Sequence, residues 1–126
     1  MPLIRVSLLK GKPPEYRKAI LDRVYQAMRE AFDVPEDDRF MLIDEYERDN
    51  FLFSASYLGI ARDDDFVIIE ITANNTRTLE KKKAFYARFA EILAKTPGIR
   101  PENVFVNLVE VAKENWSFGN GIAQYG

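Results

Sequence analysis

Cysteine and histidine are both absent from this chain of 126 residues. Without cysteine, no disulfide can form and no thiolate can attack a substrate. Zinc and most transition metals lose the ligands that they prefer in proteins. Mechanisms that pair a serine or cysteine nucleophile with histidine are excluded as well. An enzyme with this composition that works near neutral pH must take its acid–base group from a perturbed carboxylate, lysine or tyrosine, or from its amino terminus.

The sequence also lacks a large excess of charge and any long hydrophobic run. Lysine and arginine number 18 against 20 aspartates and glutamates, so the net charge is −2 and no nucleic-acid or anionic membrane partner is indicated. The apolar stretches have the length of strands, far below the ~20 residues that span a bilayer. Arg5 and Lys10 interrupt the first stretch, so we expect no signal peptide and a cytoplasmic protein.

A pattern of strand, helix and strand occurs twice along the chain. Alternating or continuous apolar residues of strand length are followed each time by an amphipathic helical pattern and then by another strand. The tail "NWSFGNGIAQYG" predicts a C-terminal hairpin that turns at Gly119-Asn120-Gly121. Strands are predicted at 3–9, 40–46, 66–72 and 104–111, and helices at 15–32 and directly after Thr78, a plausible N-cap.

The two halves of the chain also resemble each other. "VPEDDRFMLIDE" at 34–45 matches "RPENVFVNLVE" at 100–110 if one residue is skipped, and the strands and helices have nearly the same offset. Each parallel pair of strands needs a crossover, and right-handed crossovers place both helices on one face of a sheet. We therefore expect one α/β (α+β) domain over 1–126, with β-α-β repeats at about 2–46 and 66–111. These repeats would form a four-stranded mixed sheet with two helices on one face.

The chain begins Met1-Pro2 and enters a strand at once. Chains that begin Met-Pro generally lose the methionine, which leaves the proline as the first residue with a free secondary amine. Burial of an amine in an apolar pocket disfavours its charged form and lowers its pKa toward neutrality. The amine can then act as a general base and afterwards as an acid. Many proteins begin Met-Pro without any catalytic use of the proline, and a retained Met1 would turn this nitrogen into an amide.

Four features together resemble the tautomerase superfamily, and within it malonate semialdehyde decarboxylase and its relatives. They are the Met-Pro start on a strand, the two β-α-β halves, "FDVPEDDRF" after the first helix, and "ENWSFGNG" near the end. The resemblance covers essentially the whole chain. It implies a homotrimer with pockets near the subunit boundaries, a small oxo-acid substrate and no cofactor.

The resemblance also implies roles for individual residues. Pro2 matches the catalytic amino-terminal proline of the family, and Asp38 matches a carboxylate that orients or activates water. Arg77 matches one of two arginines that precede the second helix, and its guanidinium can hold a substrate carboxylate with two parallel hydrogen bonds. The other arginine is replaced here by Asn75, which can donate a hydrogen bond but brings no charge.

The remaining candidates concern the walls of the pocket. Trp116 and Phe118 match aromatic residues that could exclude water from the proline, although ordinary core or interface packing is the alternative. Arg62, in "LGIAR", lies in a stretch that resembles a family loop and is a further candidate for substrate contact. Plain structural alternatives exist for Asp38, as a surface residue of an acidic turn, and for Arg77, as a solvated arginine at a helix entry.

These features favour a cofactor-free enzyme that interconverts the keto and enol forms of a small oxo carboxylic acid. Two alternatives stay open. The first is decarboxylation or hydration of malonate semialdehyde or a related three-carbon acid, against which Asn75 counts. The second is a trimeric binding protein that has the fold without the chemistry, because a fold does not fix a function. A retained Met1 would favour this second alternative.

Overall fold

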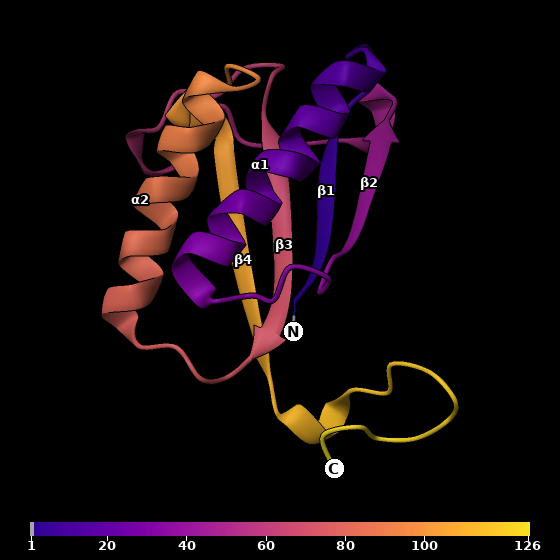
Figure 1. The fold of residues 1–126 in the computed structure, drawn as a ribbon. Helices are drawn as coiled ribbons and strands as arrows, with labels where there is room; N and C mark the ends of the chain where they lie inside the picture. Colours follow the sequence, from indigo (N-terminus) through magenta and orange to yellow (C-terminus); the bar gives the residue numbers. More distant parts are fainter. Residues whose placement is uncertain (1) are drawn as a thin grey trace.

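The computed structural model describes residues 2–126, which form one four-stranded mixed sheet with two helices packed on the same face (Figure 1). The strand order is β2-β1-β3-β4, with β1 parallel to β2, antiparallel to β3, and β3 parallel to β4. The predicted α+β architecture of two β-α-β units is confirmed. The elements are β1 (Leu3–Leu9), α1 (Pro14–Phe32), β2 (Phe40–Tyr46), β3 (Val67–Asn74), α2 (Leu79–Lys95) and β4 (Val104–Val111).

The helices begin and end where local chemistry favours it. Pro14 occupies the first turn of α1, where its missing N–H costs no helical hydrogen bond. Asp33 ends α1 in the left-handed region, with φ of 53°. The Oγ1 of Thr78 accepts a hydrogen bond from the N–H of Lys81 at 3.3 Å, as the predicted N-cap of α2 should. Neither of the two helices between residues 2 and 126 is both long and apolar enough to cross a membrane.

The core lies between the helices and one face of the sheet. Alternate residues of β1 point into it, and Val6 is fully buried beside Ile69 of β3. The two helices meet through aromatic rings, because the fully buried Phe85 of α2 packs on Phe32 of α1 with ring centroids 4.5 Å apart. This packing leaves the other residues of each strand on the opposite side of the sheet.

Neither helix of residues 2–126 packs on that opposite side, which we call the open face. Its strand residues include large apolar side chains that are 40 to 52% exposed. A soluble monomer rarely leaves so many apolar side chains of one sheet face in water. These side chains are Leu3, Phe40, Leu42, Phe105 and Val109.

Two segments differ from a regular βαβ pattern. The connection 47–66 contains two short 3-10 turns and no strand. The chain reverses direction after Phe118 as predicted, but as a loop without strand pairing, so the expected hairpin is wrong. The side chain of Gln124 replaces the missing ladder, because its Oε1 accepts from the N–H of Phe118 at 2.9 Å and its Nε2 donates to the carbonyl of Gly119 at 3.0 Å.

Candidate active site

One end of the sheet brings together chain segments that are far apart in sequence. The parallel strands β1 and β2 both start there, with Leu3 paired to Phe40. The strands β3 and β4 both end there, with Asn74 paired to Val111. The C-terminal segment lies beyond this same end of the sheet, near the start of β1 (Figure 1). Pro2, directly before β1, is therefore surrounded by residues from both halves of the chain.

A pocket of about 230 Å³ occupies this end of the sheet, and Pro2 is buried at its wall. Trp116 and Phe118 also line it, so the structure brings three of the predicted site residues together. Leu3, Phe40 and Ser117 complete the lining, and none of the three was predicted from the sequence. Phe40 could have been predicted, because parallel pairing of the first two strands places the start of β2 beside the start of β1.

The aromatic wall of the pocket is held by the C-terminal loop. The rings of Trp116 and Phe118 are stacked, with centroids 5.5 Å apart and an interplanar angle of 17°. Tyr125 meets the far side of Phe118 edge-on at 5.2 Å. Gly119 has φ of 140°, a conformation that a side chain would strain, and it allows the chain to turn back directly after Phe118. The loop thus supplies an apolar surface that faces Pro2.

Asn74, at the end of β3, connects this wall to the predicted arginine. Its Oδ1 accepts a hydrogen bond from the Nε1–H of Trp116 at 2.8 Å. Its main-chain carbonyl accepts from an NH1 group of Arg77 at 3.2 Å. The resemblance points to the neighbouring Asn75 and not to Asn74, whose partners lie 42 and 3 residues away.

Arg77 lies beside the C-terminal end of α1 and does not line the pocket itself. Its NH2 group donates to the carbonyl of Phe32 at 3.2 Å, and its guanidinium lies over the ring of Phe32, 4.6 Å from the centroid. Burial lowers the pKa of the Arg77 guanidinium, while the carboxylates of Glu110 and Asp33 oppose the shift. Both of these hydrogen bonds go to main-chain carbonyl oxygens, which carry no formal charge.

The other predicted polar residues are distributed differently. Asn75 is exposed, and its N–H donates to the carbonyl of Val111 at 3.1 Å. Asp38 is half-buried in the turn before β2, where its N–H donates to the carbonyl of Pro35 at 3.1 Å. Burial raises the pKa of the Asp38 carboxyl, and the charge of Asp37 raises it further. Neither Asn75 nor Asp38 lines the pocket of Pro2 in a single chain.

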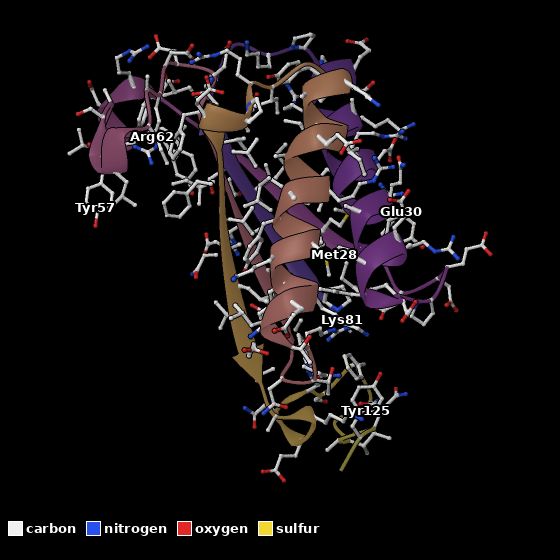
Figure 2. The ribbon with its side chains drawn as sticks, turned by 90° about the vertical axis from the view of Figure 1, so that its left-hand side faces the viewer. Met28, Glu30, Tyr57, Arg62, Lys81 and Tyr125 are labelled. Carbon is white, nitrogen blue, oxygen red and sulfur yellow. The ribbon has the colours of Figure 1, made fainter. Side chains whose placement is uncertain are left out.

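Arg62 lies at the opposite end of the molecule, far from the tail that carries Tyr125 (Figure 2). Its NH1 donates to the carbonyls of Ser54, Tyr57 and Ile60 at 3.1 to 3.3 Å. These bonds hold the 47–66 connection in its folded shape. Within one chain, the structure therefore does not bring Arg62 to the pocket of Pro2.

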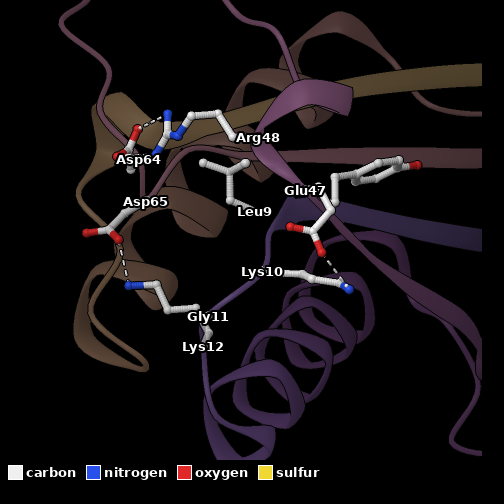
Figure 3. Close-up of a pocket in the computed structure, with 9 residues that line it drawn as sticks. Leu9, Lys10, Gly11, Lys12, Glu47, Arg48, Asp64 and Asp65 are labelled. Carbon is white, nitrogen blue, oxygen red and sulfur yellow. Dashed lines mark hydrogen bonds and ion pairs between the residues drawn. The ribbon is translucent and has the colours of Figure 1, made fainter.

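A second, larger pocket of about 400 Å³ lies at the other end of β1 and β2 (Figure 3). Three cations line it, but each already binds a carboxylate: Lys10 with Glu47, Lys12 with Asp65, and Arg48 with Asp64. None of the predicted site residues lines this pocket. Between residues 2 and 126, no group of three or more carboxylates gathers where it could hold a metal ion. The chemistry therefore favours the smaller, apolar pocket at Pro2.

Comparison with known proteins identifies the family. A family model described as tautomerase enzyme matches residues 38–119, and another with the same description matches residues 2–60. The probable tautomerase YusQ of Bacillus subtilis (strain 168) is 37% identical over 124 residues, which cover 98% of both chains.

Two solved structures are similar to this chain over nearly its whole length. A malonate semialdehyde decarboxylase, described with decarboxylase and hydratase activities, is 31% identical, with a TM-score of 0.91 over 98% of this chain and 95% of that one. The FG41 malonate semialdehyde decarboxylase inhibited by 3-bromopropiolate is 35% identical, with a TM-score of 0.90 over 98% and 93% of the two chains. This chain belongs to the tautomerase superfamily, in its malonate semialdehyde decarboxylase-like group, and is an isomerase-like enzyme.

Proposed function

We propose that this enzyme interconverts the enol and keto forms of a small oxo carboxylic acid, with the amine of Pro2 as general base and then acid. The observation that carries the proposal is the burial of Pro2 in an apolar pocket with Trp116 and Phe118. Removal of Met1 frees the nitrogen of Pro2 as a secondary amine. The apolar wall disfavours the charged amine, so its pKa falls toward the pH of the cell.

The proton balance of the reaction needs only this one group. The neutral amine of Pro2 takes the proton of the enol hydroxyl, and the O–H electron pair forms the carbonyl as the C=C bond opens. The carbon then takes a proton from the ammonium of Pro2, which restores the neutral amine. A single group near its pKa can give and accept protons with similar ease.

The polar candidates have separate roles in this proposal. The guanidinium of Arg77 binds the substrate carboxylate, and the side chain of Asn75 donates a further hydrogen bond to it. Asp38, whose carboxyl has a raised pKa, polarises the substrate or orients a water molecule. Arg62 takes no part in this mechanism within the same chain, since it holds the 47–66 connection.

The test is a tautomerase assay on protein whose first residue has been established by intact mass. Phenylenolpyruvate suits the assay because its enol absorbs in the ultraviolet and the signal decays on ketonisation. We expect protein that begins at Pro2 to accelerate the decay above the buffer rate. No acceleration by such protein, across several oxo acids, would overturn the proposal.

Decarboxylation of malonate semialdehyde is the second candidate, and the similarity to two malonate semialdehyde decarboxylases favours it. In that reaction a protonated Pro2 polarises the aldehyde oxygen, so that the carbanion is stabilised as an enol while carbon dioxide leaves. Asn75 counts against this candidate, because an amide holds a carboxylate less tightly than a second guanidinium would.

Asn75→Arg is therefore expected to lower the KM for malonate semialdehyde about tenfold, which is the gain of one charge-assisted hydrogen bond. Release of carbon dioxide, measured with substrate labelled in the carboxyl group, gives the rate. Asn75→Gln is the matched control, because it lengthens the side chain without adding charge. An unchanged KM in Asn75→Arg would contradict the assignment of this position to the substrate carboxylate.

We also propose that the enzyme is a homotrimer. The open face of the sheet carries Leu3, Phe40, Leu42, Phe105 and Val109, all substantially exposed in a single chain. Association of copies through this face would remove their apolar surface from water. Leu3 and Phe40 also line the pocket of Pro2, so the assembly would change the pocket's wall. Sedimentation of the protein at the mass of one 14.6 kDa chain would contradict this proposal.

A further inference from the structure

We infer that Asn74 is a positioning residue of this site: its side chain fixes the indole of Trp116 against the pocket of Pro2, and so keeps water from the amine. The inference rests on the proposed function for its consequence in catalysis. The contact itself rests on geometry alone. No sequence pattern marks Asn74, which lies 42 residues before its partner.

Asn74 is a buried polar residue at the end of β3, and its side chain meets a partner far away in sequence. Residues 68, 70, 72 and 74 of β3 point to the open face, because Val67, Ile69, Ile71 and Ala73 point into the core. Asn74 is nevertheless only 7% exposed. Its side chain meets Trp116, which follows the short turn Lys113–Asn115 after β4.

The chemistry of the two side chains makes their contact specific. An indole Nε1–H is only a donor, and a partly buried indole needs an acceptor for it. The Oδ1 of Asn74 supplies that acceptor at 2.8 Å. Since Trp116 stacks on Phe118, the same hydrogen bond fixes the position of both rings that face Pro2.

Asn74 also lies between the wall and the substrate-binding arginine. Its side chain holds Trp116, while its main-chain carbonyl holds Arg77. A substitution at this position removes the first contact and retains the second. The substitution therefore separates two effects. Exclusion of water from the Pro2 amine affects kcat and its pH dependence, whereas binding of the substrate carboxylate by Arg77 affects KM.

Trp116 is the only tryptophan of the chain, so its emission reports on this contact without labelling. In Asn74→Ala we expect the emission to move to longer wavelength and acrylamide quenching to increase, because the released indole meets water. We expect kcat to fall about tenfold, the loss of one buried hydrogen bond, with little change in KM. The acid limb of the pH–rate profile should move to higher pH, because a wetter amine is easier to protonate.

Two variants make the test specific. Asn74→Asp keeps an acceptor at the same place, so its emission should match that of the natural protein. Asn103→Ala removes another buried asparagine, 0% exposed, at the other end of the sheet. There the side chain of Asn103 accepts from the N–H of Asp63 and donates to its carboxylate. Any general loss of stability should appear in Asn103→Ala as well, but its emission and pH–rate profile should not change.

Unchanged emission and quenching in Asn74→Ala would overturn the inference. So would a double variant Asn74→Ala/Trp116→Phe that is much less active than Trp116→Phe alone, because Asn74 would then act through something other than the indole. The fluorescence is measured without substrate. If Asn74→Ala shows the expected emission shift but the natural protein has no tautomerase activity, the proposed function is overturned and the contact is supported.

Discussion

Enzyme in which Met1 cannot be removed is expected to lose its tautomerase activity, with kcat/KM lower by about 10²–10⁴-fold, the usual contribution of a general acid–base group. Insertion of a lysine between Met1 and Pro2 prevents removal of the methionine, because the aminopeptidase that removes initiator methionines requires a small second residue. The nitrogen of Pro2 is then part of a tertiary amide, which has no basic lone pair and no proton to give. The rate of enol decay measures the loss, and intact mass establishes the first residue.

Pro2→Ala is the matched control for the insertion. It retains a free amine at the same place after methionine removal, but the amine is primary and lacks the rigid ring. We expect its activity to fall between those of the natural protein and the blocked one. Activity in the blocked protein equal to that of the natural one would show that the nitrogen of Pro2 is not the base.

Arg77→Ala is expected to lower kcat/KM by about 10²-fold or more, mostly through KM, because two charge-assisted hydrogen bonds to the substrate carboxylate are lost. The sharpest measurement compares an oxo acid with its methyl ester. The natural enzyme should prefer the acid, and the variant should lose that preference. Arg77→Lys should recover only part of it, since an ammonium group lacks the planar pair of donors.

Arg77 also holds the carbonyls of Phe32 and Asn74, so its removal is expected to destabilise the fold as well. Arg88→Ala serves as the control, because Arg88 pairs with Glu30 and Glu91 on the helical surface and has no place in the site. A variant Arg77→Ala that unfolds earlier in denaturant but still prefers the acid over the ester would contradict the substrate role and leave a structural one.

The architecture could be predicted because its signals are local and consistent. Alternation in 3–9 and the helical spacing after Pro14 and Thr78 specify elements whose order then limits the topology. The tail could not be predicted in the same way. Gly119 and its neighbours specify a reversal of the chain. A hairpin also needs two strands that pair through main-chain hydrogen bonds, and here the side chain of Gln124 bonds the main chain instead.

The lining of the pocket could be predicted in part from the resemblance, but the long-range contacts around it could not. Pro2 belongs to the Met-Pro start, Trp116 and Phe118 belong to "ENWSFGNG", and all three line one pocket. Asn74 belongs to none of these motifs, and its role follows from a hydrogen bond across 42 residues. Arg62 was a candidate because its loop resembles a loop of the family. That resemblance did not predict that its guanidinium bonds the 47–66 connection, at the other end of the molecule from Pro2.

The pKa of the Pro2 amine tests the central claim most directly. It can be followed by NMR in protein with ¹⁵N-labelled proline, titrated after intact mass has shown that Met1 is gone. We predict a pKa clearly below the ordinary α-amino range of about 7.7–8.0, and a rise toward that range when Trp116 is replaced by alanine. A pKa within or above that range in the natural protein would contradict the account, because the amine would then be no more sheltered than one on an open surface.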